Sequence, residues 1–183
     1  TELETYYEMG ADILVRITDL GVVGYVDGPD VLLKVEQVGA EEHIRIATPV
    51  GELHSIGVRT ATSPWIPFPI KRPVKTLDDL EVLLWYQEQK VWKPRADYSA
   101  FNALVEQVGD DGFATASVGA SPLQILLEGY MGVEPFYDLL LTHTDKVEAW
   151  MNVCHEQNKR YMELVAESPA EVAIGYENTS MSN

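Results

Sequence analysis

The sequence has little cysteine, no long apolar run and no nucleotide-binding motif, and each absence excludes a class of protein. Cys154 is the only cysteine among the 183 residues, which excludes a disulfide framework. The uncharged apolar runs are far shorter than the roughly 20 residues that a membrane-spanning helix needs, so we expect no membrane contact. The GxGxxG, Walker A, HExxH, GxSxG and EF-hand motifs are all absent. Nucleotide-dependent and serine-hydrolase chemistry are therefore not expected.

Basic residues are scarce as well. The chain has 13 Lys and Arg against 29 Asp and Glu, a formal net charge of −16, and residues 96–145 contain no Lys or Arg. Such a chain repels phosphate backbones, so we expect no nucleic-acid partner and attribute the acidity to solubility. The sequence does not open with a basic segment followed by an apolar one, so no signal peptide is expected. Together with the single cysteine, this favours a reducing, cytoplasmic location.

The residues that are present indicate a globular α/β fold. Apolar residues make up 46% of the chain, and compact β-branched or small-residue runs predict buried strands near residues 12–17, 112–118 and 171–176. Amphipathic segments between these runs predict helices at 96–109 and 133–143 and a long helix from Thr144 onward. Helices between short buried strands imply that the strands pair in parallel.

A different pattern fills residues 22–72, where we expect an antiparallel excursion. Ile44 and Ile46 alternate with His43 and Arg45, which is typical of a strand with one face in water. The predicted strands of this region are 31–38, 43–50 and 52–60. The proline-rich residues that follow, 65–73, exclude a helix and predict an extended connector.

Two helix starts have clear capping signals. Thr76 with Asp79 resembles a capping box, in which Asp replaces the usual Glu or Gln. Ser121 is a predicted N-cap, with Pro122 at the first helical position and Gln124 as the third residue of the box.

Candidate site residues follow the predicted parallel strands, because chemistry in such folds gathers at the carboxyl ends of strands. Asp19 and Glu177 are the candidate catalytic residues: two carboxylates in one pocket can act as acid and base or hold an NH-bearing substrate. The alternative is that Asp19 caps a turn and Glu177 faces solvent. Candidate substrate-binding residues are Thr18, Ser121, Gln124 and Asn178, although Gln124 also has the structural role of a cap.

No metal site is expected within this chain. His43 and His54 fall in the antiparallel region without clustered ligands, and no histidine has zinc spacing around it. Cys154 lies on the apolar stripe of its predicted helix, which indicates a buried and inert thiol.

Five segments in order resemble a known family. They are ADILVRITDLG, ATPVGEL, KRPVKTLDDLEVL, GASPLQILLEGYMG and GYENTSMSN, and they cover most of the chain from residue 11. The chain resembles the decarboxylase-like and corrinoid methyltransferase-like branch of the uroporphyrinogen decarboxylase superfamily. The resemblance implies a (β/α)8 TIM barrel with the excursion at 22–72. Because such a barrel needs roughly 250 residues, residues 1–183 are expected to form a single incomplete domain, a partial barrel that aggregates without its remainder.

The resemblance also implies an activity, which we expect to be methyl transfer linked to a corrinoid protein. Zinc and a corrinoid would then act in the complete protein, with no cofactor held within this chain. Asp19 matches an aspartate that binds pyrrole NH groups in the decarboxylases, and Glu177 with Asn178 matches a polar pair facing the cleft. The alternatives are a lyase that decarboxylates a carboxylated tetrapyrrole, or a non-catalytic tetrapyrrole- or corrinoid-binding module. A small-molecule or tetrapyrrole substrate, a corrinoid protein and a homodimer are the expected partners.

Overall fold

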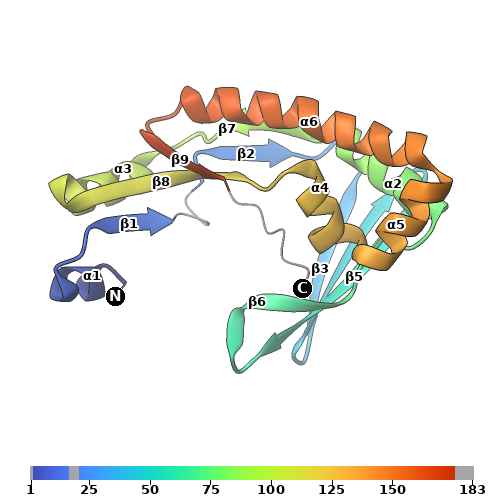
Figure 1. Ribbon diagram of the computed structural model, residues 1–183, viewed down its shortest axis with the longest axis horizontal. Helices are drawn as coiled ribbons and strands as arrows, with labels where there is room; N and C mark the ends of the chain where they lie inside the picture. The colour runs from blue at the N-terminus through green and yellow to red at the C-terminus, as the bar shows by residue number, and fades with distance from the viewer. Residues whose placement is uncertain (1, 17–20, 176–183) are drawn as a thin grey trace. The chain divides into compact units, whose positions relative to one another are not determined.

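A computed structural model describes residues 2–16 and 21–175 of the chain (Figure 1). The chain divides into two compact units, which are described separately below. Unit 1 consists of Thr1–Val26, Trp92–Ala120 and Gln157–Asn183. Unit 2 consists of Asp27–Val91 and Ser121–Glu156.

Unit 1 is built on a three-stranded parallel sheet in the order β1-β8-β9 (Figure 1). The strands are β1 (Ile13–Arg16), β8 (Gly112–Gly119) and β9 (Val172–Gly175), so the three predicted strands and their parallel pairing are confirmed. Gly112 lies directly opposite Ile13, and a side chain at Gly112 would clash with the Ile13 backbone. This close approach explains why β8 begins with glycine.

Helices and a small second sheet complete unit 1. The helices are α1 (Glu2–Met9), α3 (Ser99–Val108), followed by a 3₁₀ turn (η1, Gly109–Asp111), and the last part of α6 (Thr144–Ala166). The second sheet pairs β2 (Val23–Val26) with β7 (Val91–Pro94). The buried residues pack as one cluster: Val22, Val23, Phe101, Ala114, Ala116, Leu164 and Val165.

Unit 2 contains a four-stranded antiparallel sheet in the order β3-β4-β5-β6. Its strands are β3 (Leu32–Val38), β4 (Glu41–Thr48), β5 (Gly51–Thr60) and β6 (Ser63–Lys71). Ile46 pairs with Leu53 on the buried face, whereas Arg45 pairs with His54 on the opposite face. The predicted antiparallel strands are therefore confirmed, and one face is buried at β4 and β5, whereas β3 is exposed on both faces.

β6 is a finding that differs from the expected connector, because the proline-rich segment pairs with β5 as an edge strand. Pro64, Pro67 and Pro69 lie within it. Proline cannot donate to a ladder, so it is tolerated in a strand only at the edge of a sheet or at a bulge. The irregular register between β5 and β6 agrees with this explanation.

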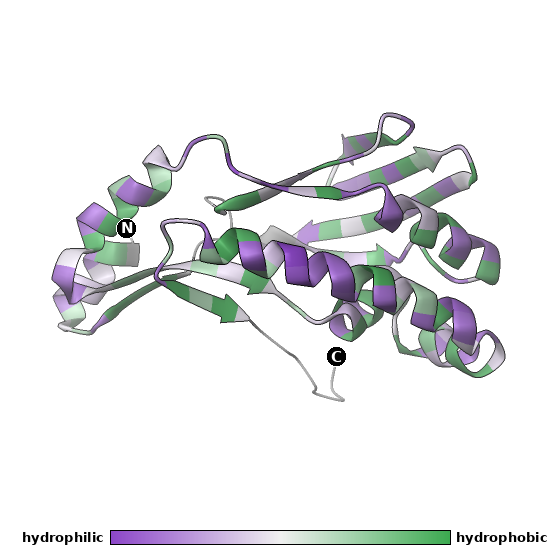
Figure 2. Cartoon of the chain, turned by 90° about the horizontal axis from the view of Figure 1, so that it is seen from above, coloured by the Kyte–Doolittle hydropathy of each residue, from purple (hydrophilic) through white to green (hydrophobic). Residues whose placement is uncertain are grey.

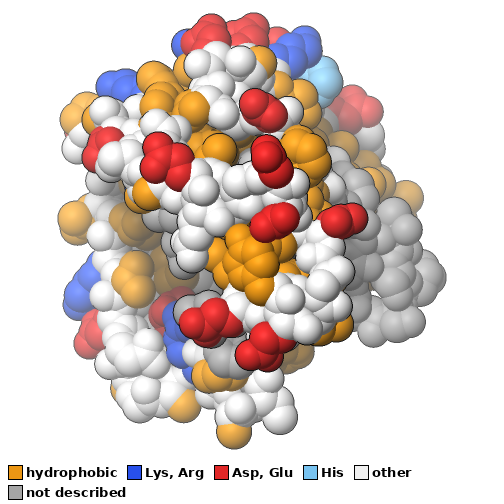
Figure 3. All heavy atoms as spheres, turned by 90° about the vertical axis from the view of Figure 1, so that its left-hand side faces the viewer, with side chains coloured by type: hydrophobic (Ala, Val, Ile, Leu, Met, Phe, Trp, Pro, Cys, Tyr) orange, Lys and Arg blue, Asp and Glu red, His pale blue; other side chains and the backbone are white. Residues whose placement is uncertain are grey.

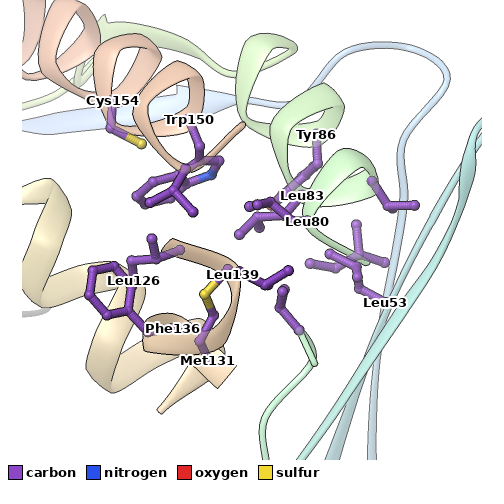
Figure 4. Packing of buried hydrophobic residues seen from close by; sticks show 14 residues of the cluster. Leu53, Leu80, Leu83, Tyr86, Leu126, Met131, Phe136, Leu139, Trp150 and Cys154 are labelled. Carbon is purple, nitrogen blue, oxygen red and sulfur yellow. The ribbon is translucent and has the colours of Figure 1, made fainter. Parts of the chain in front are cut away.

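The core of unit 2 lies between the sheet and its helices (Figure 4). The helices are α2 (Leu77–Glu88), α4 (Pro122–Gln124), a π-helical segment (η2, Ile125–Met131), α5 (Val133–Thr142) and the first part of α6. Trp150 and Cys154 from α6 point toward Leu80 and Leu83 of α2 and toward Leu126 (Figure 4). The fully buried side chains of this cluster include Leu53, Val74, Leu80, Leu83, Leu126, Val147 and Trp150.

Helix α6 combines hydrophilic and hydrophobic residues along its length (Figure 2). Its buried residues recur at helical spacing: Val147, Trp150, Cys154, Leu164 and Val165. The face in Figure 3 shows many more acidic than basic side chains, with hydrophobic side chains exposed between them. This surface is consistent with the net charge of −16.

The prediction of a partial (β/α)8 TIM barrel is wrong. A barrel of this kind closes eight parallel strands on themselves, whereas the described residues form three separate sheets, one of them with four antiparallel strands. The three parallel strands reproduce the local strand-helix alternation, but β3, β4, β5 and β6, which lie between β1 and β8 in the sequence, pair antiparallel. The expectation of a single incomplete domain stays a prediction.

Candidate functional site

The carboxyl edge of the β1-β8-β9 sheet is the place where the sequence predicted the site. The three strands are adjacent and parallel, so their carboxyl ends lie along one edge. β1 ends at Arg16 and β9 at Gly175. The predicted residues Thr18, Asp19, Glu177 and Asn178 follow these strands and lie outside the described residues.

Two side-chain hydrogen bonds hold this sheet in place. Thr115 on β8 is almost fully buried, and its Oγ1 donates to the backbone oxygen of Val15 at 3.0 Å. Tyr161 on α6 donates its hydroxyl to the backbone oxygen of Ser117 at 2.6 Å, and burial raises the pKa of Tyr161. The hydroxyl therefore stays protonated at neutral pH and acts as a donor that ties α6 to β8.

Ser121 and Gln124 have the capping geometry that the sequence predicted. The Gln124 backbone N–H donates to Ser121 Oγ at 3.2 Å, and Pro122 occupies the first helical position. The Gln124 side chain is only 5% exposed. Both residues belong to unit 2, whereas β1 and β9 belong to unit 1. Their predicted role in binding a substrate stays a prediction.

A chain of four polar side chains on the wet face of the antiparallel sheet was missed by sequence analysis. Lys71 Nζ lies 3.0 Å from His54 Nδ1, and His54 Nε2 lies 3.3 Å from His43 Nδ1. His43 Nε2 lies 2.9 Å from Glu41 Oε2. The antiparallel register brings these side chains together across β4, β5 and β6, which the sequence spacing alone did not indicate.

Lys71 and Glu41, the two ends of this row of hydrogen bonds, determine which nitrogen of each imidazole carries the proton. A lysine ammonium only donates and a carboxylate only accepts, so His54 Nδ1 accepts from Lys71 and His54 Nε2 carries the proton. The same reasoning makes His43 Nδ1 the acceptor and places the His43 proton on Nε2, where it is donated to Glu41. With both rings neutral, each of the three contacts in this row has one donor and one acceptor.

The pKa of His54 is lowered, first by burial and then by the neighbouring positive charges of Lys71 and Arg45. Protonation of Nδ1 would also remove the acceptor that faces Lys71. Moving a proton from a lysine ammonium to a carboxylate costs about 8 kcal/mol in water, because their ordinary pKa values differ by about six units. This row of four side chains therefore links neighbouring strands by hydrogen bonds, and we assign no reaction to it.

Lys90 and Cys154 are a second pair of titratable side chains in unit 2. Lys90 Nζ lies 4.4 Å from the centroid of the Tyr86 ring, a cation-π contact, and burial lowers the pKa of Lys90. Burial raises the pKa of the Cys154 thiol to about 12, so the thiol is protonated at neutral pH. The prediction that Cys154 is buried is confirmed.

The hollow beside α2 has a volume of about 510 Å³ and is open to solvent. Lys146 pairs with Glu81 at 2.8 Å within it. The remaining lining residues are Val50, Asp78, Val82, Leu84, Trp85 and Glu88. The lining combines three acidic residues and one lysine with apolar side chains, and no chemistry follows from it alone.

A zinc site has no candidate ligands within residues 2–16 and 21–175. No group of three His, Cys, Asp or Glu side chains in this part of the chain is arranged to hold a metal ion. The zinc that the resemblance implies was expected in the complete protein and not within this chain, and we derive no step through it.

No helix among the described residues is long and apolar enough to cross a membrane.

No protein-family model matches the chain, and no curated protein or solved structure matches it significantly. The resemblance to the uroporphyrinogen decarboxylase superfamily therefore stands on the quoted sequence segments alone, as a hypothesis.

Proposed function

We propose that this chain binds a small organic or tetrapyrrole substrate beside the carboxyl edge of the β1-β8-β9 sheet and serves methyl transfer with a corrinoid protein. One observation carries the proposal: three adjacent parallel strands end at the same edge. Ligands of open parallel sheets bind outside this edge. The sequence resemblance supplies the reaction class, and the single cysteine supports a cytoplasmic location.

The chain's own polar residues have specific roles in this proposal. Asp19 and Glu177 act as the acid-base pair or hold an NH-bearing substrate, because two carboxylates in one pocket separate in pKa. Thr18 and Asn178 orient them. The corrinoid belongs to the partner protein and is a substrate of this chain, not a resident cofactor.

The test measures methyl transfer from methylcobalamin to a thiol in the intact protein. We expect Asp19→Ala and Glu177→Gln each to lower turnover about a hundredfold or more. Asp110→Asn is the matched control, because Asp110 lies in the turn before β8, at the opposite end of that strand. It should retain full turnover.

Three other results would overturn the proposal. Unchanged turnover in both variants would remove the two carboxylates from the site. Loss of carbon dioxide from a carboxylated porphyrinogen, without methyl transfer, would select the decarboxylase. Binding of a tetrapyrrole with neither reaction would select the non-catalytic binding module.

A further inference from the structure

Strand β3 is an open edge of the antiparallel sheet. It pairs with β4 on one side, and no strand among residues 2–16 and 21–175 pairs with its other side. All seven residues of β3 are exposed. Leu32 is 69% exposed and Val35 is 58% exposed. A long, apolar, unpaired edge is a template for pairing with another strand.

The turn after β3 determines which backbone groups point outward. Val38 and Glu41 close a hairpin whose turn is Gly39-Ala40, and the closing pair of a two-residue hairpin is hydrogen-bonded. Hydrogen bonding to a given neighbour alternates along a strand. Lys34 and Glu36 therefore bond to β4, whereas Leu33, Val35 and Gln37 direct their N–H and C=O groups to the open side.

The sequence of β3 is self-complementary about Val35. In an antiparallel pair of two identical β3 strands centred on Val35, Lys34 lies opposite Glu36 of the second copy and Leu32 lies opposite Val38. Opposed side chains in such pairs are about 4.5–5.5 Å apart at Cβ, and opposite charges stabilise them. The outward-facing residues then form about six hydrogen bonds between the copies.

Charge also selects this register. A shift by two residues would place Lys34 opposite Lys34, or Glu36 opposite Glu36, of the second copy, which is repulsive. Lys34 and Glu36 already lie 3.0 Å apart within one chain, so the two strands would carry four charges that alternate in sign around a rectangle. β3 is neutral within a chain of net charge −16, so it is a surface where two copies can approach without repulsion.

We propose that two copies of this chain associate through β3 about a two-fold axis at Val35, which joins their four-stranded sheets into one continuous antiparallel sheet. The occupant of the edge is a second copy because the charges and apolar residues of β3 complement themselves. This interface is independent of the proposed site, since β3 belongs to unit 2 and the parallel sheet to unit 1.

Charge reversal tests the interface. By sedimentation velocity over a concentration series, we expect the wild-type protein to approach twice the mass of one chain. Lys34→Glu and Glu36→Lys should each be monomeric at concentrations where the wild type is dimeric. The double variant Lys34→Glu/Glu36→Lys should dimerise again, and an equimolar mixture of the two single variants should form a heterodimer.

Lys159→Glu is the matched control, because it makes the same charge change on α6 and should leave the dimer intact. A cross-link provides a second measurement. Val35→Cys should form an intermolecular disulfide on mild oxidation, since paired strands place the two Cα atoms about 5.5 Å apart. Val133→Cys, exposed on α5, should not. A monomeric wild type, or single reversals that still dimerise, would overturn the proposal, as would a double variant that stays monomeric.

Discussion

His43 Nδ1 and His54 Nε2 lie 3.3 Å apart although the two residues belong to different strands and are separated by eleven positions. Their rings are stacked with centroids 5.4 Å apart. The contact places His54 between another imidazole and the Lys71 ammonium. The protonation of His54 is thereby coupled to the pairing of β4, β5 and β6.

Stability should decline as pH falls below about 6.5, the ordinary pKa of histidine. The pKa of His54 is lowered in the folded chain, so the unfolded chain takes up the proton first and the free energy of unfolding falls. The stability that neutral His54 contributes is fully present above pH 6.5, and it is lost as the pH drops through the pKa of His54 in the folded chain. Urea unfolding at pH 7.5 and 5.5 should show that His54→Gln lessens this decline. An identical pH dependence in wild type and variant would contradict it.

Lys71→Met should raise the pKa of His54 toward its ordinary value. The variant removes the positive charge 3.0 Å from His54 Nδ1, one of the causes of the lowered pKa. An NMR titration of the His54 ring carbons measures the shift directly. Lys75→Met, an exposed lysine four residues further on, should leave the titration unchanged. The explanation fails if both variants titrate like the wild type.

Leu83→Ala should destabilise the protein by about 2–5 kcal/mol, because the side chain is fully buried in the core of unit 2 and its loss leaves a cavity. Leu141→Ala makes the same change on α5, where the side chain is 81% exposed, and should cost less than about 0.5 kcal/mol. Urea unfolding of the two variants gives both values. Equal losses would show that the packing in Figure 4 is wrong.

Cys154 should react slowly with a thiol reagent in the folded protein at pH 8. The thiol is buried and its pKa is raised to about 12, so very little thiolate is present. Adding urea should make the reaction fast. Val133→Cys introduces an exposed thiol as a control, which should react at once without urea. Rapid labelling of wild-type Cys154 in buffer would contradict its burial.

Local features of the fold could be predicted because each depends on neighbouring residues. Thr76 and Asp79 form the expected capping box: Asp79 N–H donates to Thr76 Oγ1 and Thr76 N–H donates to Asp79 Oδ2. Gly10 directly follows α1 and adopts a positive φ of 61°, a backbone conformation that glycine favours at the end of a helix. The β-branched runs could be predicted as strands for the same reason, because the pattern that favours a strand extends over only a few residues.

Long-range pairing could not be predicted in the same way. Where β2 pairs with β7, the Trp92 ring contacts Tyr25 and Tyr161 edge-on, and these three residues lie far apart in the sequence. The barrel prediction failed because strand-helix alternation is the same in open and closed sheets. Closure depends on how many strands pair, which no local pattern contains.

The contact between His43 and His54 could have been predicted from the sequence. The turn at Pro49-Val50 pairs Thr48 with Gly51, and counting back along the two strands brings Arg45 opposite His54. His43 then lies diagonally across from His54 on the same face.

The two edges of the antiparallel sheet differ in their capacity to recruit further strands. β3 presents a complete set of backbone donors and acceptors, whereas Pro64, Pro67 and Pro69 leave β6 without three N–H groups. Pairing through β3 consumes one edge of each copy and leaves proline-rich strands at both ends of the joined sheet. Assembly would therefore terminate at two copies instead of propagating into a fibril.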